Sequence, residues 1–199
     1  MGKEKYLKEA EELFRKSPVV SSSSISRLVR GKKRIKQYPK QLLRNMVLKG
    51  KIKRLVKGYY TIHDNPALAV FCFKPAYLGL QDALSFHELW GQETIPVIIS
   101  AKKIRQGIRK ILRNNVLIRR IDKKYLFGFD YYEQGRIYFP YSDIEKTFID
   151  MIYFKEKISK ETRMNVLKRI NKKKLGLYLK AYHKKFRKKV LKYMENNLK

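Results

Sequence analysis

The chain has 199 residues and a formal net charge of +31 at pH 7. A hydrophobic content of 44% supports a packed core and excludes a wholly disordered chain. The single cysteine, Cys72, excludes a disulfide framework, and no apolar run has the length that crosses a membrane. We therefore expect a cytoplasmic protein without membrane contact, whose charge favours a polyanionic partner.

The positive charge lies mainly at the two ends of the chain. Residues 1–62 hold 18 Lys and Arg against 4 Asp and Glu, a net +14, and residues 155–199 hold 17 against 3, again +14. Residues 63–154 hold 13 against 10, a net +3. A uniformly solvated lysine surface predicts no such division. Because Asn65-Pro66 is a typical break, we expect one domain over residues 1–66 and a second over 67–199.

The first domain is expected to begin with three helices. Apolar residues recur at helical spacing up to Lys16, and Pro18 ends this first helix. Ser21–Ser24 can supply the N-cap of a second short helix. Pro39 suits the first turn of a third helix, which Gly50 closes.

The third predicted helix has two different faces on a wheel of about 100° per residue. Leu42, Leu43, Met46 and Val47 fall on an apolar arc, which suits packing. The opposite arc presents side chains that contact DNA, since Arg recognises guanine and Gln or Asn recognises adenine. The candidate recognition residues are Lys40, Gln41, Arg44 and Asn45.

Residues 51–62 predict a basic β-hairpin with its turn at Val56-Lys57-Gly58. A helix followed by a basic hairpin is typical of a winged helix-turn-helix, with the helix in a DNA groove and the wing beside phosphates. The alternative is an amphipathic helix with a merely solvated polar face. The candidate DNA-binding residues of the turn and wing are Lys32, Lys33, Arg34, Lys51, Lys53, Arg54, Lys57 and Tyr59.

The middle of the chain predicts a small mixed α+β domain, so the fold class expected for the whole chain is α+β. Ser142-Asp143-Ile144-Glu145 has the pattern of a capping box that opens a helix. The elements expected before it are a helix over 77–90, a strand over 94–100, a basic, partly helical or irregular connector over 102–115, and strands over 116–121, 125–132 and 136–139.

Residues 155–199 predict a basic helical extension of the second domain. Its apolar stripe consists of Leu175, Leu179, Tyr182, Phe186, Val190 and Tyr193. The stripe can pack on its own domain, form a dimer or lie on an anionic membrane, so the chain is expected to be a monomer or a homodimer. The candidate residues of a secondary basic surface are Lys180, Lys184, Lys185, Lys188 and Lys189.

No pattern of catalytic or metal-binding residues is present. His63, His87 and His183 lack zinc-ligand spacing with one another or with Cys72. The sequence has neither a glycine-rich phosphate-binding motif nor a nucleophile elbow. We expect no enzymatic activity, no metal and no cofactor.

Three further segments resemble a known family. They are KPAYLGLQDALSFHELWGQ (Lys74–Gln92), the IPVIIS strand that follows, and DIEKTFIDMIYF (Asp143–Phe154). With Gly58-Tyr59-Tyr60 in the hairpin, their order is similar to that of the AbiEi antitoxin family, whose members are also described as transcriptional regulators of viral defence systems. The resemblance spans about residues 7–154. Glu88 departs from it, because the family commonly has glycine there.

The resemblance implies a sequence-specific DNA-binding antitoxin that represses its own type IV toxin–antitoxin operon. The winged helix would bind inverted repeats in double-stranded operator DNA, and the C-terminal domain would support antitoxicity against a nucleotidyltransferase-like toxin, with or without direct contact. Two alternatives stay open. One is a winged-helix regulator without antitoxin activity. The other is an RNA- or ribosome-associated basic protein that stacks bases on Tyr125, Phe127, Phe129, Tyr131, Tyr132 and Tyr138.

Overall fold

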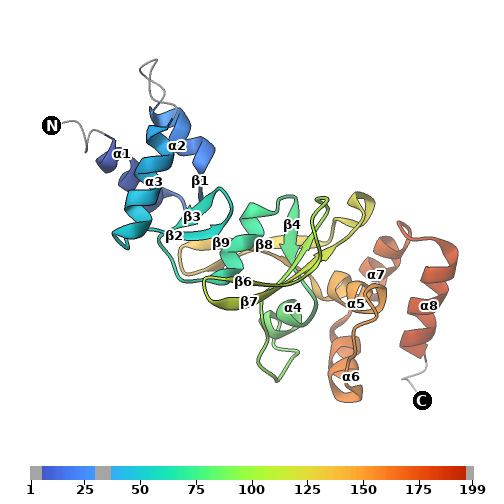
Figure 1. Ribbon diagram of the computed structural model, residues 1–199. Helices are drawn as coiled ribbons and strands as arrows, with labels where there is room; N and C mark the ends of the chain where they lie inside the picture. Colours follow the sequence, from blue (N-terminus) through green and yellow to red (C-terminus); the bar gives the residue numbers. More distant parts are fainter. Residues whose placement is uncertain (1–5, 30–36, 196–199) are drawn as a thin grey trace. The chain divides into compact units, whose positions relative to one another are not determined.

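The computed structural model describes residues 6–29 and 37–195 and has an α+β fold (Figure 1). The chain forms two compact units. Unit 1 comprises residues 1–72 together with 110–114, and unit 2 comprises residues 73–109 together with 115–199. Unit 1 thus extends beyond residue 66, because the 3₁₀ helix η1 (Pro66–Cys72), with Leu68 and Val70 fully buried, belongs to it.

The described part of unit 1 combines helices with a small antiparallel sheet of strand order β1-β3-β2. Its core contains Phe14, Ile25, Leu43 and Met46. The elements before η1 are α1 (Leu7–Lys16), β1 (Val20–Ser21), α2 (Ser22–Val29), α3 (Tyr38–Leu48), β2 (Lys53–Val56) and β3 (Tyr59–Thr61).

Local sequence signals explain these elements. Ser21 Oγ accepts a hydrogen bond from Ser24 N at 3.1 Å, which caps α2 as predicted. Pro39 lies in the first turn of α3, where its missing N–H costs no helical hydrogen bond. Lys57 and Gly58 form the hairpin turn, and the φ of +82° at Gly58 suits glycine.

Unit 2 is built on a mixed sheet of strand order β6-β7-β5-β4-β9-β8, although residues 110–114, at the junction of β6 and β7, are grouped with unit 1. β4 pairs antiparallel with β5 and parallel with β9, while β5 pairs parallel with β7. The strands are β4 (Ala76–Leu78), β5 (Val97–Ser100), β6 (Gly107–Ile111), β7 (Asn114–Arg120), β8 (Phe129–Gln134) and β9 (Ile137–Ser142). The helices are α4 (Leu80–Phe86), η2 (Lys123–Tyr125), α5 (Ile144–Tyr153), α6 (Lys160–Arg169), α7 (Lys172–Leu179) and α8 (Lys184–Glu195).

Two predictions for this unit are wrong in detail. The helix expected over 77–90 is instead a strand, β4, followed by the short helix α4. Gly79 separates them, and a Cβ atom there would lie 2.6 Å from Ile99 Cδ1, so glycine permits the close approach to β5. The connector expected over 102–115 contains a regular strand, β6, whose neighbour in the sheet is β7.

The ends of α4 and α5 show how caps set helix boundaries. Asp143, one residue after the predicted Ser142, is the N-cap of α5, and its Oδ1 accepts a hydrogen bond from Lys146 N at 2.7 Å. At the end of α4, Glu88 N donates to Ser85 O at 3.0 Å and Leu89 N to Leu84 O at 2.8 Å. This bonding pattern puts Glu88 in the left-handed region, with φ +59°, where glycine is the usual residue.

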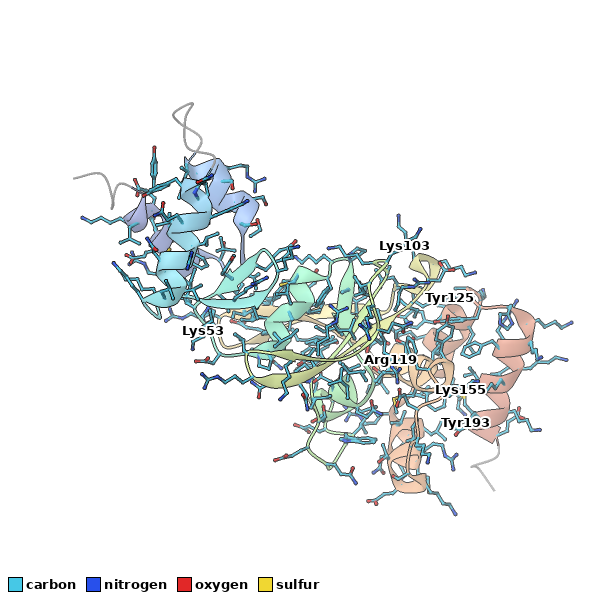
Figure 2. The ribbon with its side chains drawn as sticks, in the orientation of Figure 1. Lys53, Lys103, Arg119, Tyr125, Lys155 and Tyr193 are labelled. Carbon is cyan, nitrogen blue, oxygen red and sulfur yellow. The ribbon has the colours of Figure 1, made fainter. Side chains whose placement is uncertain are left out.

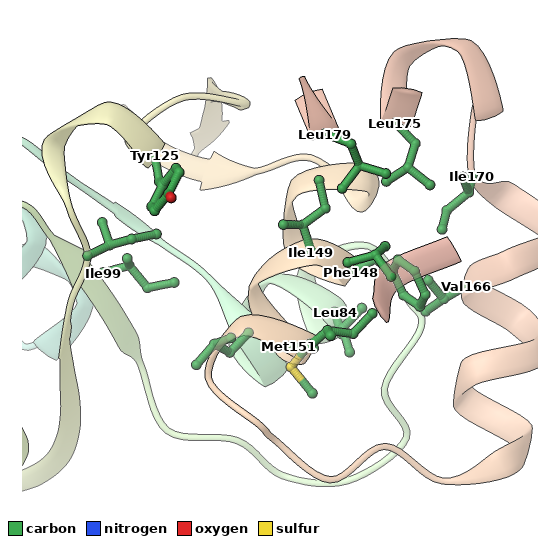
Figure 3. Packing of buried hydrophobic residues seen from close by; sticks show 14 of the residues in the cluster. Leu84, Ile99, Tyr125, Phe148, Ile149, Met151, Val166, Ile170, Leu175 and Leu179 are labelled. Carbon is green, nitrogen blue, oxygen red and sulfur yellow. The ribbon is translucent and has the colours of Figure 1, made fainter. Parts of the chain in front are cut away.

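The apolar stripe of the C-terminal region packs on its own unit. Leu175 and Leu179 on α7, and Tyr182, Phe186 and Val190 after it, belong to the same buried cluster as Phe148 and Ile149 of α5 (Figure 3). The stripe is carried by two helices, not one, because the chain turns over residues 180–183. Among the residues described, no helix has the length and apolar character needed to cross a membrane.

Asp82 on α4 has a half-buried carboxyl group beside the start of β5. Its Oδ2 accepts a hydrogen bond from Val97 N at 3.1 Å. Burial raises the pKa of Asp82 to about 7, and the hydrogen bond from Val97 opposes this shift. Because the folded protein then holds the proton more tightly than the unfolded chain, ionisation destabilises the fold progressively between about pH 4 and pH 7.

We expect Asp82→Asn to raise the free energy of unfolding at pH 8 by roughly 2 kcal/mol and to change it little at pH 4. The full pKa difference corresponds to about 4 kcal/mol, but the side chain keeps some contact with water. An amide oxygen can still accept the bond from Val97 N. Urea unfolding at the two pH values measures the difference, and an equal effect at both would contradict this assignment.

Candidate nucleic-acid interface

The polar arc of α3 is exposed to solvent. Lys40, Gln41, Arg44 and Asn45 all lie on the surface, whereas Leu42, Leu43 and Met46 are buried in the core of unit 1. Gln37, Lys40, Gln41 and Arg44 line a shallow hollow. The structure thus brings the four predicted recognition residues to one side of a single helix.

The two cations of this side have no carboxylate partner in the described residues. The ion pairs of unit 1 involve Lys16, Lys51 and Lys53, not Lys40 or Arg44. Their charges are therefore available to an anionic ligand. Leu48, at the end of α3, is 74% exposed, and Val47 is partly exposed, so the surface of the helix is also apolar at this end.

The predicted wing contains free and paired cations. Arg54 and Lys57 are exposed. Lys51 Nζ lies 2.5 Å from Glu11 Oε1, and Lys53, which is labelled in Figure 2, pairs with Asp64. Such exposed pairs contribute little to stability, so a phosphate can replace either carboxylate at low cost.

The other residues predicted to contact DNA in unit 1 are Tyr59 and the three residues of the basic turn. Tyr59 is half-buried in β3, where it pairs with Val56 and Ser21 across the sheet. The predicted residues of the basic turn, Lys32, Lys33 and Arg34, lie outside the described residues.

The predicted secondary basic surface lies on unit 2. Phe186 and Val190 lie on the buried side of α8. Lys184, Lys185, Lys188 and Lys189 lie on its exposed side. In the described chain none of these lysines forms an ion pair. The exposed residues are Lys180, Lys184, Lys185, Lys188 and Lys189.

The predicted base-stacking aromatic residues mostly belong to the core. Tyr125 is buried and stacks on Tyr182 at a centroid distance of 4.2 Å, and Phe127, Phe129 and Tyr132 are partly buried. Tyr131 and Tyr138 are 56% and 54% exposed. Glu133 accepts a hydrogen bond from the Tyr138 hydroxyl at 3.1 Å, and Asp130 lies next to Tyr131 in β8. These carboxylates repel phosphates, which disfavours base stacking here.

Unit 2 also contains a buried ionic network that was not predicted from the sequence. Lys146 and Asp150, four residues apart on α5, form an ion pair with both side chains fully buried. Tyr77 OH donates a hydrogen bond to Asp150 Oδ2 at 2.6 Å, and Lys146 Nζ donates to Tyr182 OH at 3.2 Å. The Lys146 ammonium also lies 5.3 Å from the centroid of the Phe127 ring.

This network is held by contacts within the unit. Burial lowers the pKa of Lys146 and raises that of Asp150, while the attraction between the two charges opposes both shifts. Tyr77 comes from β4 and Tyr182 from the turn before α8, so the network joins three parts of unit 2. The signal in the sequence was an i, i+4 Lys–Asp pair inside an otherwise apolar helix.

The described residues offer no metal site, because no three His, Cys, Asp or Glu side chains gather suitably. Cys72 is buried. His87 Nε2 lies 2.8 Å from Ser142 O, a contact that holds α4 against the end of β9. The burial of Cys72 and the contact made by His87 are typical of residues that stabilise the fold.

The comparisons with known proteins concern the fold of this chain and not its function. Neither a protein-family model nor a curated protein matches the sequence. Among solved structures, the chain is similar to the RV2827C protein from Mycobacterium tuberculosis, known from a crystal structure, with a TM-score of 0.61 and 11% sequence identity. The similarity covers 96% of this chain and 76% of that one.

Proposed function

We propose that this protein binds duplex DNA sequence-specifically, with unit 1 acting as a winged helix-turn-helix. The observation that carries the proposal is the exposed arc of α3, on which Gln41, Arg44 and Asn45 lie above a buried apolar arc. The order of helices and strands, with the β2–β3 hairpin directly after α3, supports the same reading. In such modules the helix lies in the major groove.

Each exposed side chain has a distinct role in this proposal. Arg44 can donate two hydrogen bonds to the O6 and N7 atoms of guanine, and Gln41 or Asn45 can pair with adenine. Lys40, Arg54 and Lys57 contact phosphates, which position the module without reading sequence. Lys180, which follows α7, and the exposed lysines of α8 add phosphate contacts from unit 2.

We further propose that the DNA is the promoter of the protein's own operon, and that unit 2 supports neutralisation of a nucleotidyltransferase-like toxin. This part rests on the resemblance to the AbiEi family. The segments that carry the resemblance form β4, α4, β5 and α5, and most of their apolar residues are buried. These buried segments therefore indicate a fold. The surface of unit 2 that would oppose the toxin has to be located by experiment.

The direct test is a titration of the full chain against its own upstream DNA and a scrambled duplex of equal length. At about 150 mM salt, we expect the upstream duplex to bind at least a thousandfold more tightly. Equal affinities would exclude a sequence-specific repressor, and tighter binding to structured RNA would favour the RNA-binding alternative. Co-expression with an adjacent nucleotidyltransferase-type gene tests antitoxicity separately, by cell survival.

Arg44→Ala should weaken binding to the upstream DNA by about 1–3 kcal/mol and reduce discrimination against the scrambled duplex. The side chain is exposed, so the stability of the fold should not change. Lys57→Ala is the matched control, because loss of a phosphate contact weakens binding to all sequences alike. Unchanged operator affinity in Arg44→Ala would show that α3 is not the recognition helix.

A further inference from the structure

Unit 2 contains a cavity that the proposed DNA binding does not use. Its volume is about 750 Å³, within the range of pockets that hold small organic ligands or side chains of a partner. The end of α4 and the loop after it form one wall, and the first turns of α6 form the other. Its lining includes Glu88, Trp90, Gln92, Glu161 and Asn165.

The lining combines an indole ring with carboxylates. Trp90, the one tryptophan of the chain, is partly buried against the core of unit 2 and borders the cavity. Glu88 and Glu161 are exposed in its walls. The side-chain amides of Gln92 and Asn165 add hydrogen-bonding groups. An indole face and carboxylates are together the partners that an organic cation prefers.

Neither glutamate forms an ion pair within the described part of the chain. In the residues that the structure describes, no cation pairs with Glu88 or Glu161, although the chain has 48 Lys and Arg. The nearby Arg169 instead donates a hydrogen bond to the carbonyl oxygen of His87, at 2.6 Å. Both carboxylates therefore remain open to a ligand that enters the cavity.

Glu88 also occupies a backbone position that does not suit it. Its φ of +59° at the end of α4 favours glycine, and a carboxylate next to the C-terminus of a helix opposes the helix dipole. Lys155 has the same conformation at the end of α5, so the left-handed φ belongs to the helix end. At the end of α4 this helix end places a carboxylate in the lining of the cavity.

We propose that this cavity binds an organic cation, a guanidinium or ammonium group that contacts the Trp90 indole and pairs with Glu88 and Glu161. The group comes either from a free small molecule or from an Arg or Lys side chain of a partner protein. The inference does not depend on DNA binding, because no residue of unit 1 or of α8 takes part.

Trp90 provides the measurement, since it is the sole tryptophan of the full-length chain. The intact protein is titrated with agmatine and, separately, with an end-blocked Gly-Arg-Gly peptide, while ionic strength is held constant with NaCl. A blocked Gly-Leu-Gly peptide is the neutral control. We expect saturable changes of Trp90 fluorescence with the cationic probes and none with the neutral peptide.

Variants assign the effect to the cavity. Glu161→Gln and Glu88→Gln should each weaken binding of the cationic probe at least tenfold. Glu88→Gly should weaken binding equally and raise the unfolding temperature, because it relieves the left-handed backbone. Asp130→Asn removes one exposed charge of unit 2 outside the cavity and should leave the affinity unchanged.

The two probes distinguish the sources of the cation. Tighter binding of agmatine supports a free small molecule, and tighter binding of the peptide supports a partner's side chain. The proposal is overturned if neither cation changes the fluorescence of Trp90 at millimolar concentrations. It is also overturned if the Glu88 and Glu161 variants bind as the unmodified chain does, or if Asp130→Asn weakens binding as much as they do.

Discussion

Asp150→Asn is expected to lower the free energy of unfolding of unit 2 by about 3–5 kcal/mol. The substitution leaves the buried Lys146 ammonium without its adjacent counter-charge, and the neutral amide oxygen and the Tyr182 hydroxyl at 3.2 Å replace it as hydrogen-bond acceptors. Lys146 then either remains charged in an apolar surrounding or loses its proton on folding, and both cost free energy. Urea unfolding followed by Trp90 fluorescence reports on this unit.

Two controls separate the loss of charge balance from the loss of packing. The double substitution Lys146→Met with Asp150→Leu removes both charges and should be much less destabilising than Asp150→Asn alone. Lys124→Met breaks the exposed pair with Asp122 and should cost less than about 1 kcal/mol. If Asp150→Asn costs no more than Lys124→Met, the buried pair does not stabilise the fold as described.

The second large effect concerns salt. If the proposed complex neutralises about 6–10 phosphates, affinity for duplex DNA should fall roughly 10³–10⁵-fold between 50 and 200 mM salt. In the proposed complex, the cations of α3, the basic turn and the wing supply part of this number, and the lysines of unit 2 add further contacts. The slope of log affinity against log salt concentration counts these contacts.

Two double variants test how much the lysines of unit 2 contribute to the salt dependence of DNA binding. Lys184→Gln with Lys188→Gln removes two exposed lysines of α8 and should lower the slope by about 2. Lys103→Gln with Lys123→Gln removes two exposed lysines of the same unit, one in a loop and one in η2, and should leave the slope unchanged. Equal reductions would show that α8 provides no particular phosphate-binding surface.

Short-range signals predicted the elements around the proposed interface well. Pro39 and the apolar spacing of Leu42, Leu43 and Met46 are enough to specify α3, and Gly58 specifies the turn of the hairpin. The cap at Ser21 is also local. Such features depend on residues within one or two helical turns, so the sequence alone reveals them.

Features that depend on distant residues were not predictable in this way. Ala76–Leu78 forms a strand because β5 and β9 flank it, although the same residues continue the apolar periodicity of α4. Lys51 lies beside Glu11, 40 residues earlier. The burial of Lys146 and Asp150 depends on Tyr77 and Tyr182, which are 69 residues before Lys146 and 36 residues after it. In each case tertiary contacts override the local pattern.

The position of α8 in the core has a consequence for synthesis on the ribosome. The core of unit 1 around Phe14 is assembled from residues between Ala10 and Ile52, and η1 and residues 110–114 complete this unit. The core of unit 2 joins Tyr77 to Val190. Since domains fold as units and the earlier one folds first, unit 1 can fold long before unit 2 has received its last helices. A nascent chain therefore acquires the proposed DNA-binding unit before the unit proposed to oppose the toxin. Until α8 emerges, the exposed apolar surface of unit 2 makes the unfinished chain a target for chaperones and proteases.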